Sequence, residues 1–264
     1  MTAPGVYSTS DLLAALPIDA LVAFAVLTRV GAMMMTAPAF GDFTLSPRIR
    51  LAVALAVSAA LAPSLAGYFP KISGSPDALA ITSLIVGEAA VGLFLGLVAR
   101  MIASALNVAG QIIALQMGLS LAQIFDPSQE TQGAIIGGFL AVLGTTMIFA
   151  TDMHHVLLAA LRDSYLLFAP GGAIAVGDMA ETMIATLSIA FSLGVRLAAP
   201  FIVFGLVFYA GAGILNRLMP QAQVFFMLMP ANLILGLMLL MLTTGIMMTT
   251  FLGAFEEQMS LFIR

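Results

Sequence analysis

Side chains that could perform acid–base or metal chemistry gather at one place in the sequence, Thr151-Asp152-Met153-His154-His155. Imidazole and carboxylate groups are ligands that zinc accepts in proteins. Neighbouring side chains on a helix point about 100° apart, so His154 and His155 are a poor start for one metal site. A third ligand at a useful spacing is missing from the sequence. We therefore expect no metal, no cofactor and no catalytic residue.

The rest of the sequence lacks the short motifs of common enzyme classes. It contains no HExxH, no phosphate-binding Gly-Lys loop and no GxSxG, and its glycine pairs lack the strand-to-helix context of a nucleotide site. The chain has no cysteine, which excludes disulfides, thiolate metal sites and cysteine nucleophiles. The sequence thus predicts a protein that is not an enzyme.

Four charged residues lie inside apolar runs: Arg29, Glu88, Arg100 and Arg196. A charge at the centre of a bilayer costs about 2.5 to 3.5 kcal/mol on insertion scales, so these side chains must face protein or water. Arg100 follows Glu88 by twelve residues, too far to be its neighbour on one helix. Two interpretations stay open. The charges snorkel or pair within the chain, or they meet partners on other subunits.

Composition indicates the environment of these residues. Of 264 residues, 61% are hydrophobic and only 8% are charged, which leaves too little polar surface for a water-soluble protein. The charges are scattered singly, so nothing indicates a nucleic-acid partner. We expect an all-α, polytopic membrane protein that forms a single domain over residues 1–264.

Apolar runs bounded by proline, glycine and charge predict six or seven helical units of long, kinked hairpins. Pro47 suits a first helical turn. The run at 79–125 is too long for one crossing, and we expect it to bend at Gly110. Pro200 and Pro230 predict kinks in two later runs. The expected spans are 18–39, 49–65, 79–125, 133–150, 179–215 and 224–252.

Small residues predict where helices approach each other closely. Gly92 and Gly96 have the small-xxx-small spacing, and Gly133 with Gly137 and Gly211 with Gly213 provide similar openings. The spacing does not choose between packing inside this chain and packing between subunits.

The stretch GQIIALQMGLSLAQIFDPSQETQG, residues 110–133, places glutamines and serine in an apolar run that ends at Asp126-Pro127. The residue before proline avoids the helix, and Asp can cap the next turn. One interpretation is an irregular segment, which membrane proteins tolerate only inside protein or along an aqueous cavity. The other is a kinked helix whose glutamines bond neighbouring helices.

Several blocks resemble the FliR/SctT family, the R subunit of the export gate in flagellar and injectisome type III secretion. The general blocks are Arg29-Val30, Thr36-Ala37-Pro38, Pro47, Arg50-Leu51 and Ala62-Pro63-Ser64-Leu65. More specific are GQIIALQMGLSLAQIFDP and Asn216-Arg217-Leu218-Met219-Pro220-Gln221 with Phe225, Pro230 and Gly236. The similarity runs from about Arg29 to Leu240.

The resemblance implies a subunit that joins P- and Q-type subunits in a helical gate of the bacterial inner membrane, beside other export-apparatus membrane proteins. Unfolded flagellar or effector proteins pass through such a gate. It also implies a plug made of Met117, Gly118, Leu119, Ser120, Leu121, Ile124, Phe125, Asp126 and Pro127. Subunit packing and intramembrane charge are expected at Arg29, Glu88, Gly92, Gly96, Arg100, Arg196, Arg217, Pro220, Gln221 and Pro230. The alternative is a self-sufficient ion or solute transporter, with Glu88 as the carrier.

Overall fold

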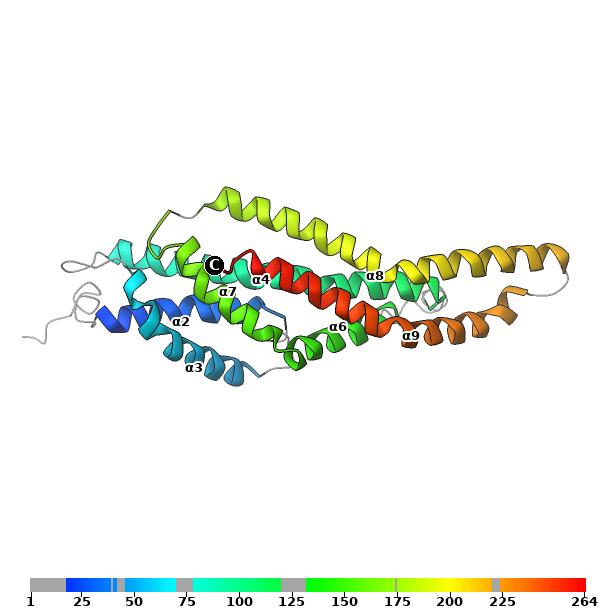
Figure 1. Ribbon diagram of the computed structural model, residues 1–264, viewed down its shortest axis with the longest axis horizontal. Helices are drawn as coiled ribbons and strands as arrows, with labels where there is room; N and C mark the ends of the chain where they lie inside the picture. Colours follow the sequence, from blue (N-terminus) through cyan, green and yellow to red (C-terminus); the bar gives the residue numbers. More distant parts are fainter. Residues whose placement is uncertain are drawn as a thin grey trace, which may run out of the picture. The chain divides into compact units, whose positions relative to one another are not determined.

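The computed structural model describes residues 18–38, 40–41, 46–69, 78–119, 132–173, 175–219 and 224–264, and within them the regular structure is helical (Figure 1). The elements are α2 (Ile18–Thr36), α3 (Pro47–Leu65), the 3-10 helix η1 (Ala66–Tyr68), α4 (Ala78–Gln116), α6 (Gln132–Ala150), α7 (Met153–Leu167), α8 (Val176–Leu218) and α9 (Val224–Ser260). The prediction of an all-α fold is confirmed.

Among the described residues, four helices are long and apolar enough to cross a membrane. They cover Pro47–Tyr68, Ala78–Gln116, Val176–Leu218 and Met227–Ser260. The broken pair Ile135–Ala150 and Met153–Leu167, bent by 74°, would be a fifth span. The bend follows from Asp152, whose φ of 59° interrupts the helical backbone. The prediction of a polytopic membrane protein is confirmed.

The chain divides into two compact units. Unit 1 falls within Met1–Arg100, His155–Met183 and Met259–Arg264, and unit 2 comprises Met101–His154 and Ile184–Gln258. Helices α4, α8 and α9 each contribute residues to both units. The single export-gate domain expected over 1–264 stays a prediction.

In unit 1, α2 packs against α3, and aromatic side chains help to fill the core. Phe94 of α4 makes edge-on contacts with Phe168 and with Phe262, at centroid distances of 5.9 and 5.7 Å. The start of α3 follows the sequence prediction, because Pro47 lies in its first turn and the side chain of Ser46 caps it. The contacts of Phe94 therefore join α4 to the residue just after α7 and to the C-terminal segment.

The expected bend at Gly110 is wrong, because α4 is one unbroken helix of 39 residues. A Cβ atom at Gly110 would collide with the backbone of Gly137 in α6. The absent side chain therefore serves a close approach between two helices of unit 2, and no proline interrupts the helix. Gly110 is a contact residue and leaves the helix axis continuous.

In unit 2, α8 and α9 form an antiparallel hairpin. Gln258 donates to the hydroxyl of Thr186 at 3.0 Å, and Asn232 donates to the hydroxyl of Tyr209 at 3.3 Å. The order of these pairs along the chain sets the opposite directions of the two helices. Pro200 and Pro230 lie inside α8 and α9, and neither ends its helix.

Candidate functional site

A buried ion pair joins α2 to α4 in unit 1. Nε of Arg29 donates to Oε2 of Glu88 at 2.7 Å, and Nη2 donates to Oε1 at 2.8 Å. Both side chains are 1% exposed. Two parallel bonds between a guanidinium and a carboxylate fix the orientation of both groups as well as their distance. The pair therefore fixes the rotation of α2 against α4.

Helix α7 completes the surroundings of Arg29. Nη1 donates to the hydroxyl of Ser164 at 3.0 Å, and Nη2 also donates to the carbonyl of Phe168 at 3.0 Å. The guanidinium carbon lies 3.7 Å from the centre of the Tyr165 ring, a cation–π contact. Arg29 thus bonds to α4, to α7 and to the residue just after α7, so its buried charge is compensated inside this chain.

Two interpretations of the intramembrane charges were left open, and this geometry decides between them for Arg29 and Glu88 alone. Arg29 and Glu88 satisfy each other, so pairing within the chain, one of the two interpretations left open, applies to this pair. Two helices brought together by folding make the pair, and no spacing on one helix predicted it. The side chains of Arg100, Arg196 and Arg217 are exposed. For these three, a role in subunit contacts stays a prediction.

Gly92 and Gly96 bring α4 close to α2. A Cβ atom at Gly92 would collide with the carbonyl oxygen of Arg29 and lie 2.9 Å from Cβ of Ala32. At Gly96 it would lie 2.6 Å from the carbonyl oxygen of Met33. Both glycines therefore pack inside this chain. By contrast, a Cβ atom at Gly211 or Gly213 in α8 would meet no described atom within 4 Å.

The expected plug begins where α4 ends. Gly118 has a φ of 78°, in the left-handed region that glycine occupies without strain. The amide of Gly118 donates to the carbonyl of Leu115 at 3.1 Å, and that of Leu119 donates to Ala114 at 3.0 Å. This pair of bonds is a Schellman motif, which closes a helix at its C-terminus. The role of Gly118 is therefore to end α4.

Three residues that the sequence reading did not single out as site residues surround this helix end in unit 2. Asn232 of α9 donates to the carbonyl of Gln116 at 3.2 Å. A Cβ atom at Gly236 of α9 would lie 2.5 Å from Cγ of Met117, and one at Gly205 of α8 would collide with the Gln116 side chain. Two signals were available in the sequence: Gly236 belongs to the block that resembles the family, and Asn232 is a polar residue in the apolar run of α9.

Eight of the predicted site residues lie outside the described part of the chain: Ser120, Leu121, Ile124, Phe125, Asp126, Pro127, Pro220 and Gln221. Met117 and Gly118 are buried, and Leu119 is half-buried. Pro230 lies in α9, two residues before Asn232. The roles predicted for all of these residues stay predictions.

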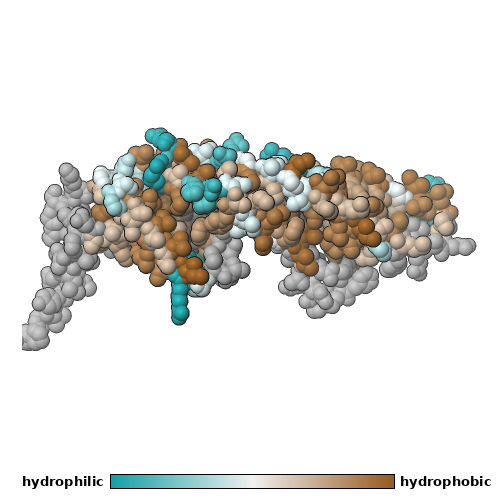
Figure 2. Space-filling model, turned by 60° about the horizontal axis from the view of Figure 1, so that its bottom comes forward, coloured by the Kyte–Doolittle hydropathy of each residue, from teal (hydrophilic) through white to brown (hydrophobic). Residues whose placement is uncertain are grey.

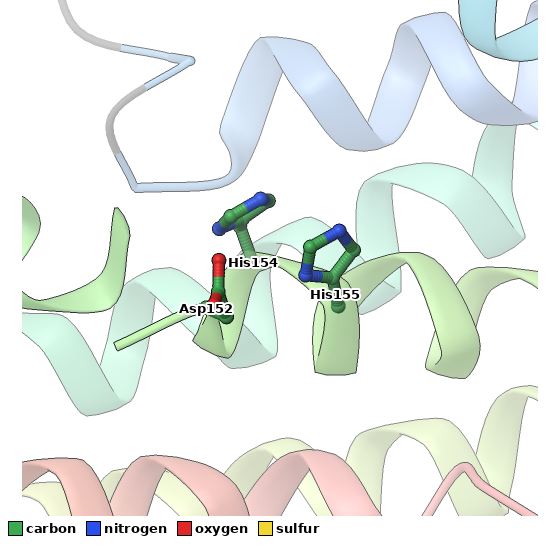
Figure 3. A group of neighbouring side chains, drawn as sticks. All are labelled: Asp152, His154 and His155. Atoms are coloured by element: carbon green, nitrogen blue, oxygen red, sulfur yellow. The ribbon is translucent and has the colours of Figure 1, made fainter. Parts of the chain in front are cut away.

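The possible metal ligands at the start of α7 lie closer together than the sequence suggested. Asp152, His154 and His155 have ligand atoms within 4.8 Å of one another (Figure 3). The statement that a third ligand is missing is therefore wrong, because the left-handed turn at Asp152 supplies one. Asp152 and His155 are exposed, and the N-terminal end of a helix disfavours a cation. Because of this exposure and this position on the helix, we expect the three side chains to bind a metal ion only weakly.

Comparison with known proteins places these features in a family. The family model described as "Bacterial export proteins, family 1" matches residues 20–258. The flagellar biosynthetic protein FliR of Caulobacter vibrioides is 39% identical over 244 residues, which cover 91% of this chain and 95% of that protein.

Two further relatives carry the same name. FliR of Escherichia coli K12 is 30% identical over 215 residues, with 81% of this chain and 80% of that protein covered. FliR of Aquifex aeolicus is 28% identical over 236 residues, with 89% of each chain covered. The resemblance found in the sequence is confirmed. The chain belongs to family 1 of the bacterial export proteins, the family of these FliR proteins.

Proposed function

We propose that this chain is a membrane subunit of the flagellar protein export apparatus, in the bacterial inner membrane within the flagellar basal body. With P- and Q-type subunits it forms the path for unfolded flagellar proteins. The relatives named FliR support the flagellar assignment, because the alignments with those of Caulobacter and Aquifex cover about nine-tenths of this chain. The proposed role is structural and requires no nucleotide, metal or cofactor.

The length of α8 supports the proposal that other proteins cover part of the apolar surface of this chain. Its exposed apolar side chains include Ile184, 71% exposed, and Leu218, 72% exposed. These residues are 34 positions apart (218 minus 184), which is about 51 Å at 1.5 Å per residue. A hydrocarbon core about 30 Å thick accommodates only about 39 Å of helix at a tilt of 40°. Lipid alone therefore leaves apolar side chains in water, and partner helices supply the remaining cover.

The surface of the α8–α9 hairpin suits such partners. Apolar side chains from both helices line a groove, and these include Val203, Phe204, Leu235, Met238 and Met241. Methionine side chains adapt to the shape of a neighbouring helix. Figure 2 shows a face in which brown, apolar residues predominate over teal ones. We propose that helices of P- and Q-type subunits occupy this groove, with Arg217, Pro220 and Gln221 at the hairpin end contributing to assembly.

The segment from Met117 to Pro127 is proposed to close the path at rest. Leu119, Leu121, Ile124 and Phe125 would fill a narrow lumen, since a hydrophobic constriction loses its water and blocks ions. The Schellman motif at Gly118 supports this, because it stops α4 immediately before these residues. Asp126-Pro127 would end the closing segment.

The alternative, a self-sufficient transporter with Glu88 as ion carrier, is less well supported. Both carboxylate oxygens of Glu88 are bonded to Arg29. A carrier would have to break this buried pair in every cycle, leaving an uncompensated charge each time.

Co-expression tests the proposal. A tagged form of this chain, produced with P- and Q-type subunits from the same bacterium, should co-purify with them as one complex of fixed stoichiometry. The chain produced alone should be poorly dispersed in the same detergent. A monodisperse preparation of this chain alone that moves a solute into liposomes would establish the transporter instead.

A further inference from the structure

We propose that residues 259–264 form a strap that fastens α4 to α7 in unit 1 and thereby keeps the polar surroundings of Arg29 in place. We call this segment, which comprises the last two residues of α9 and the four residues after them, the C-terminal strap. The strap, α7 from His155 onward and α4 up to Arg100 all belong to unit 1. The inference concerns contacts inside one chain, so it does not depend on the proposed export function.

The strap has an apolar anchor at Phe262. This side chain is 5% exposed, and its ring stands edge-on to that of Phe94 in α4, with the ring centroids 5.7 Å apart. Phe94 is itself buried and makes a second edge-on contact with Phe168, just after α7. Edge-on pairs of buried rings stabilise a fold beyond the burial of their area. The three rings therefore connect the strap, α4 and the end of α7.

The strap has a polar anchor at Asp163 of α7. The backbone amide of Arg264 donates to Oδ2 of Asp163 at 3.1 Å, and Nε of Arg162 donates to Oδ1 at 2.6 Å. The Asp163 side chain is 5% exposed, whereas that of Arg162 is 56% exposed, so water competes for the arginine. A backbone amide that donates to a carboxylate makes a charge-assisted hydrogen bond. Release of the strap would take this bond from a buried carboxylate, which is costly.

Both anchors are close to groups that bond to Arg29. Asp163 precedes Ser164, whose hydroxyl accepts a hydrogen bond from Nη1 of Arg29. Neighbouring side chains on a helix point about 100° apart, so this turn of α7 serves the strap with one side chain and Arg29 with the next. Phe168, which belongs to the ring cluster, accepts from Nη2 of Arg29 through its carbonyl. The strap therefore supports two acceptors of Arg29 from behind.

The strap is held less firmly than the helices that it joins. Its turn bonds run from the amide of Phe262 to the carbonyl of Met259 and from the amide of Ile263 to that of Ser260, each at 3.1 Å. Segments with few backbone bonds open locally at a lower cost than helix interiors. The strap can therefore release while α4 and α7 stay helical. It is also synthesised after every other part of unit 1, so its docking completes this unit.

The test uses the full chain, purified from membranes with its native partners, and hydrogen exchange measured by mass spectrometry. Phe262→Ala and Asp163→Ala should each speed exchange in residues 160–168 by about tenfold, since the loss of a buried hydrogen bond or ring changes an opening equilibrium by at least that order. Exchange in residues 26–32, around Arg29, should rise several-fold. Exchange in unit 2 should stay at the wild-type rate.

A double variant separates a strap from two unrelated contacts. If Phe262 and Asp163 hold the same segment, either substitution releases it, and the combination should speed exchange in residues 160–168 little more than one substitution does. Independent contacts would instead multiply to about a hundredfold, because the effects of uncoupled sites add as free energies.

Two matched variants control for general damage. Leu261→Ala changes a strap residue that is 63% exposed, and it should exchange like wild type. Asp163→Asn keeps a side-chain oxygen that can accept the amide of Arg264, so it should exchange far more slowly than Asp163→Ala. Should Phe262→Ala fail to accumulate in membranes, Phe262→Leu replaces it, because leucine keeps apolar bulk and loses only the edge-on contact.

Three results would overturn the inference. Unchanged exchange in residues 160–168 in both single variants would show that the strap does not fasten α7. A multiplied effect in the double variant would show that the two anchors act separately. Faster exchange in residues 160–168 with wild-type exchange in residues 26–32 would show that the strap does not support the surroundings of Arg29.

Discussion

Arg29 and Glu88 are 59 residues apart in the sequence, yet they form a buried pair with two bonds of 2.7 and 2.8 Å. Each charge is compensated mainly by the other. Removal of one partner therefore leaves a charge in an apolar interior, whereas removal of both leaves none. This difference makes the pair open to a direct test.

Replacing either member of the pair should destabilise unit 1 strongly. Glu88→Gln or Arg29→Met is expected to lower the free energy of unfolding by about 3–5 kcal/mol, because one buried charge loses its partner. The double variant Arg29→Met with Glu88→Leu should recover most of that loss. The measurements are the thermal midpoint of the purified complex and the amount of the chain in membranes.

Arg48→Met is the matched control, since Arg48 is an exposed arginine in the first turn of the apolar helix α3. It should change the thermal midpoint little. A double variant no more stable than the single ones would show that the pair is not the reason for their instability.

Gly110→Ala should weaken the contact between α4 and α6. The added methyl group would collide with the backbone of Gly137, which can move only with its helix. We expect a loss of roughly 1–3 kcal/mol, as for other overpacked sites. Gly138→Ala serves as control, because its Cβ position meets no described atom within 4 Å, and alanine favours the helix there. Equal thermal midpoints for the two variants would contradict the close approach at Gly110.

Arg217→Ala is expected to impair assembly more than membrane insertion. Arg217 lies in the last turn of α8, where a cation interacts favourably with the terminal carbonyls. The variant should reach the membrane at wild-type levels and co-purify less P- and Q-type subunit. Wild-type assembly and export would show that the residue only snorkels to the interface.

Leu121→Gly combined with Phe125→Gly should open an ion leak in the assembled complex. The change removes the apolar side chains proposed to block a narrow lumen and leaves the helices intact. Ion conductance is compared with wild type at equal assembly, and Gln123→Gly, in the same segment, removes no apolar side chain. Unchanged conductance in a fully assembled variant would assign closure to another subunit.

Local patterns in the sequence were sufficient for the positions of most helices and not for all their ends. The run expected over 79–125 is helical as α4 only to Gln116, and α7 was not among the expected spans. The start of α3 at Pro47 and the membrane-spanning character of the long helices follow from composition, proline chemistry and run length. The bend in α4 was placed wrongly because Gly110 alone does not reveal whether its missing side chain serves a bend or a neighbour. Only the position of Gly137 decides that question.

Tertiary contacts explain the other gaps. The partner of Arg29 could not be found from spacing, because the pair exists only after α2, α4 and α7 have packed together. Asn232 was not recognised because its role depends on the end of a helix 116 residues earlier in the chain. The family resemblance implied a plug from Met117 to Pro127, which stays a prediction, and it did not indicate what contacts the end of α4.

The ion pair also bears on the order in which the helices are synthesised and inserted into the membrane. Arg29 lies near the middle of α2, and when that helix leaves the ribosome its carboxylate partner is still 59 residues from being made. The chain is synthesised at about 5–20 residues per second, so Glu88 is made roughly 3–12 s after Arg29, and Ser164 is made later still. An isolated α2 with this charge is costly in lipid. We therefore expect α2 to take its final position only after α4 has been made and Glu88 can pair with Arg29.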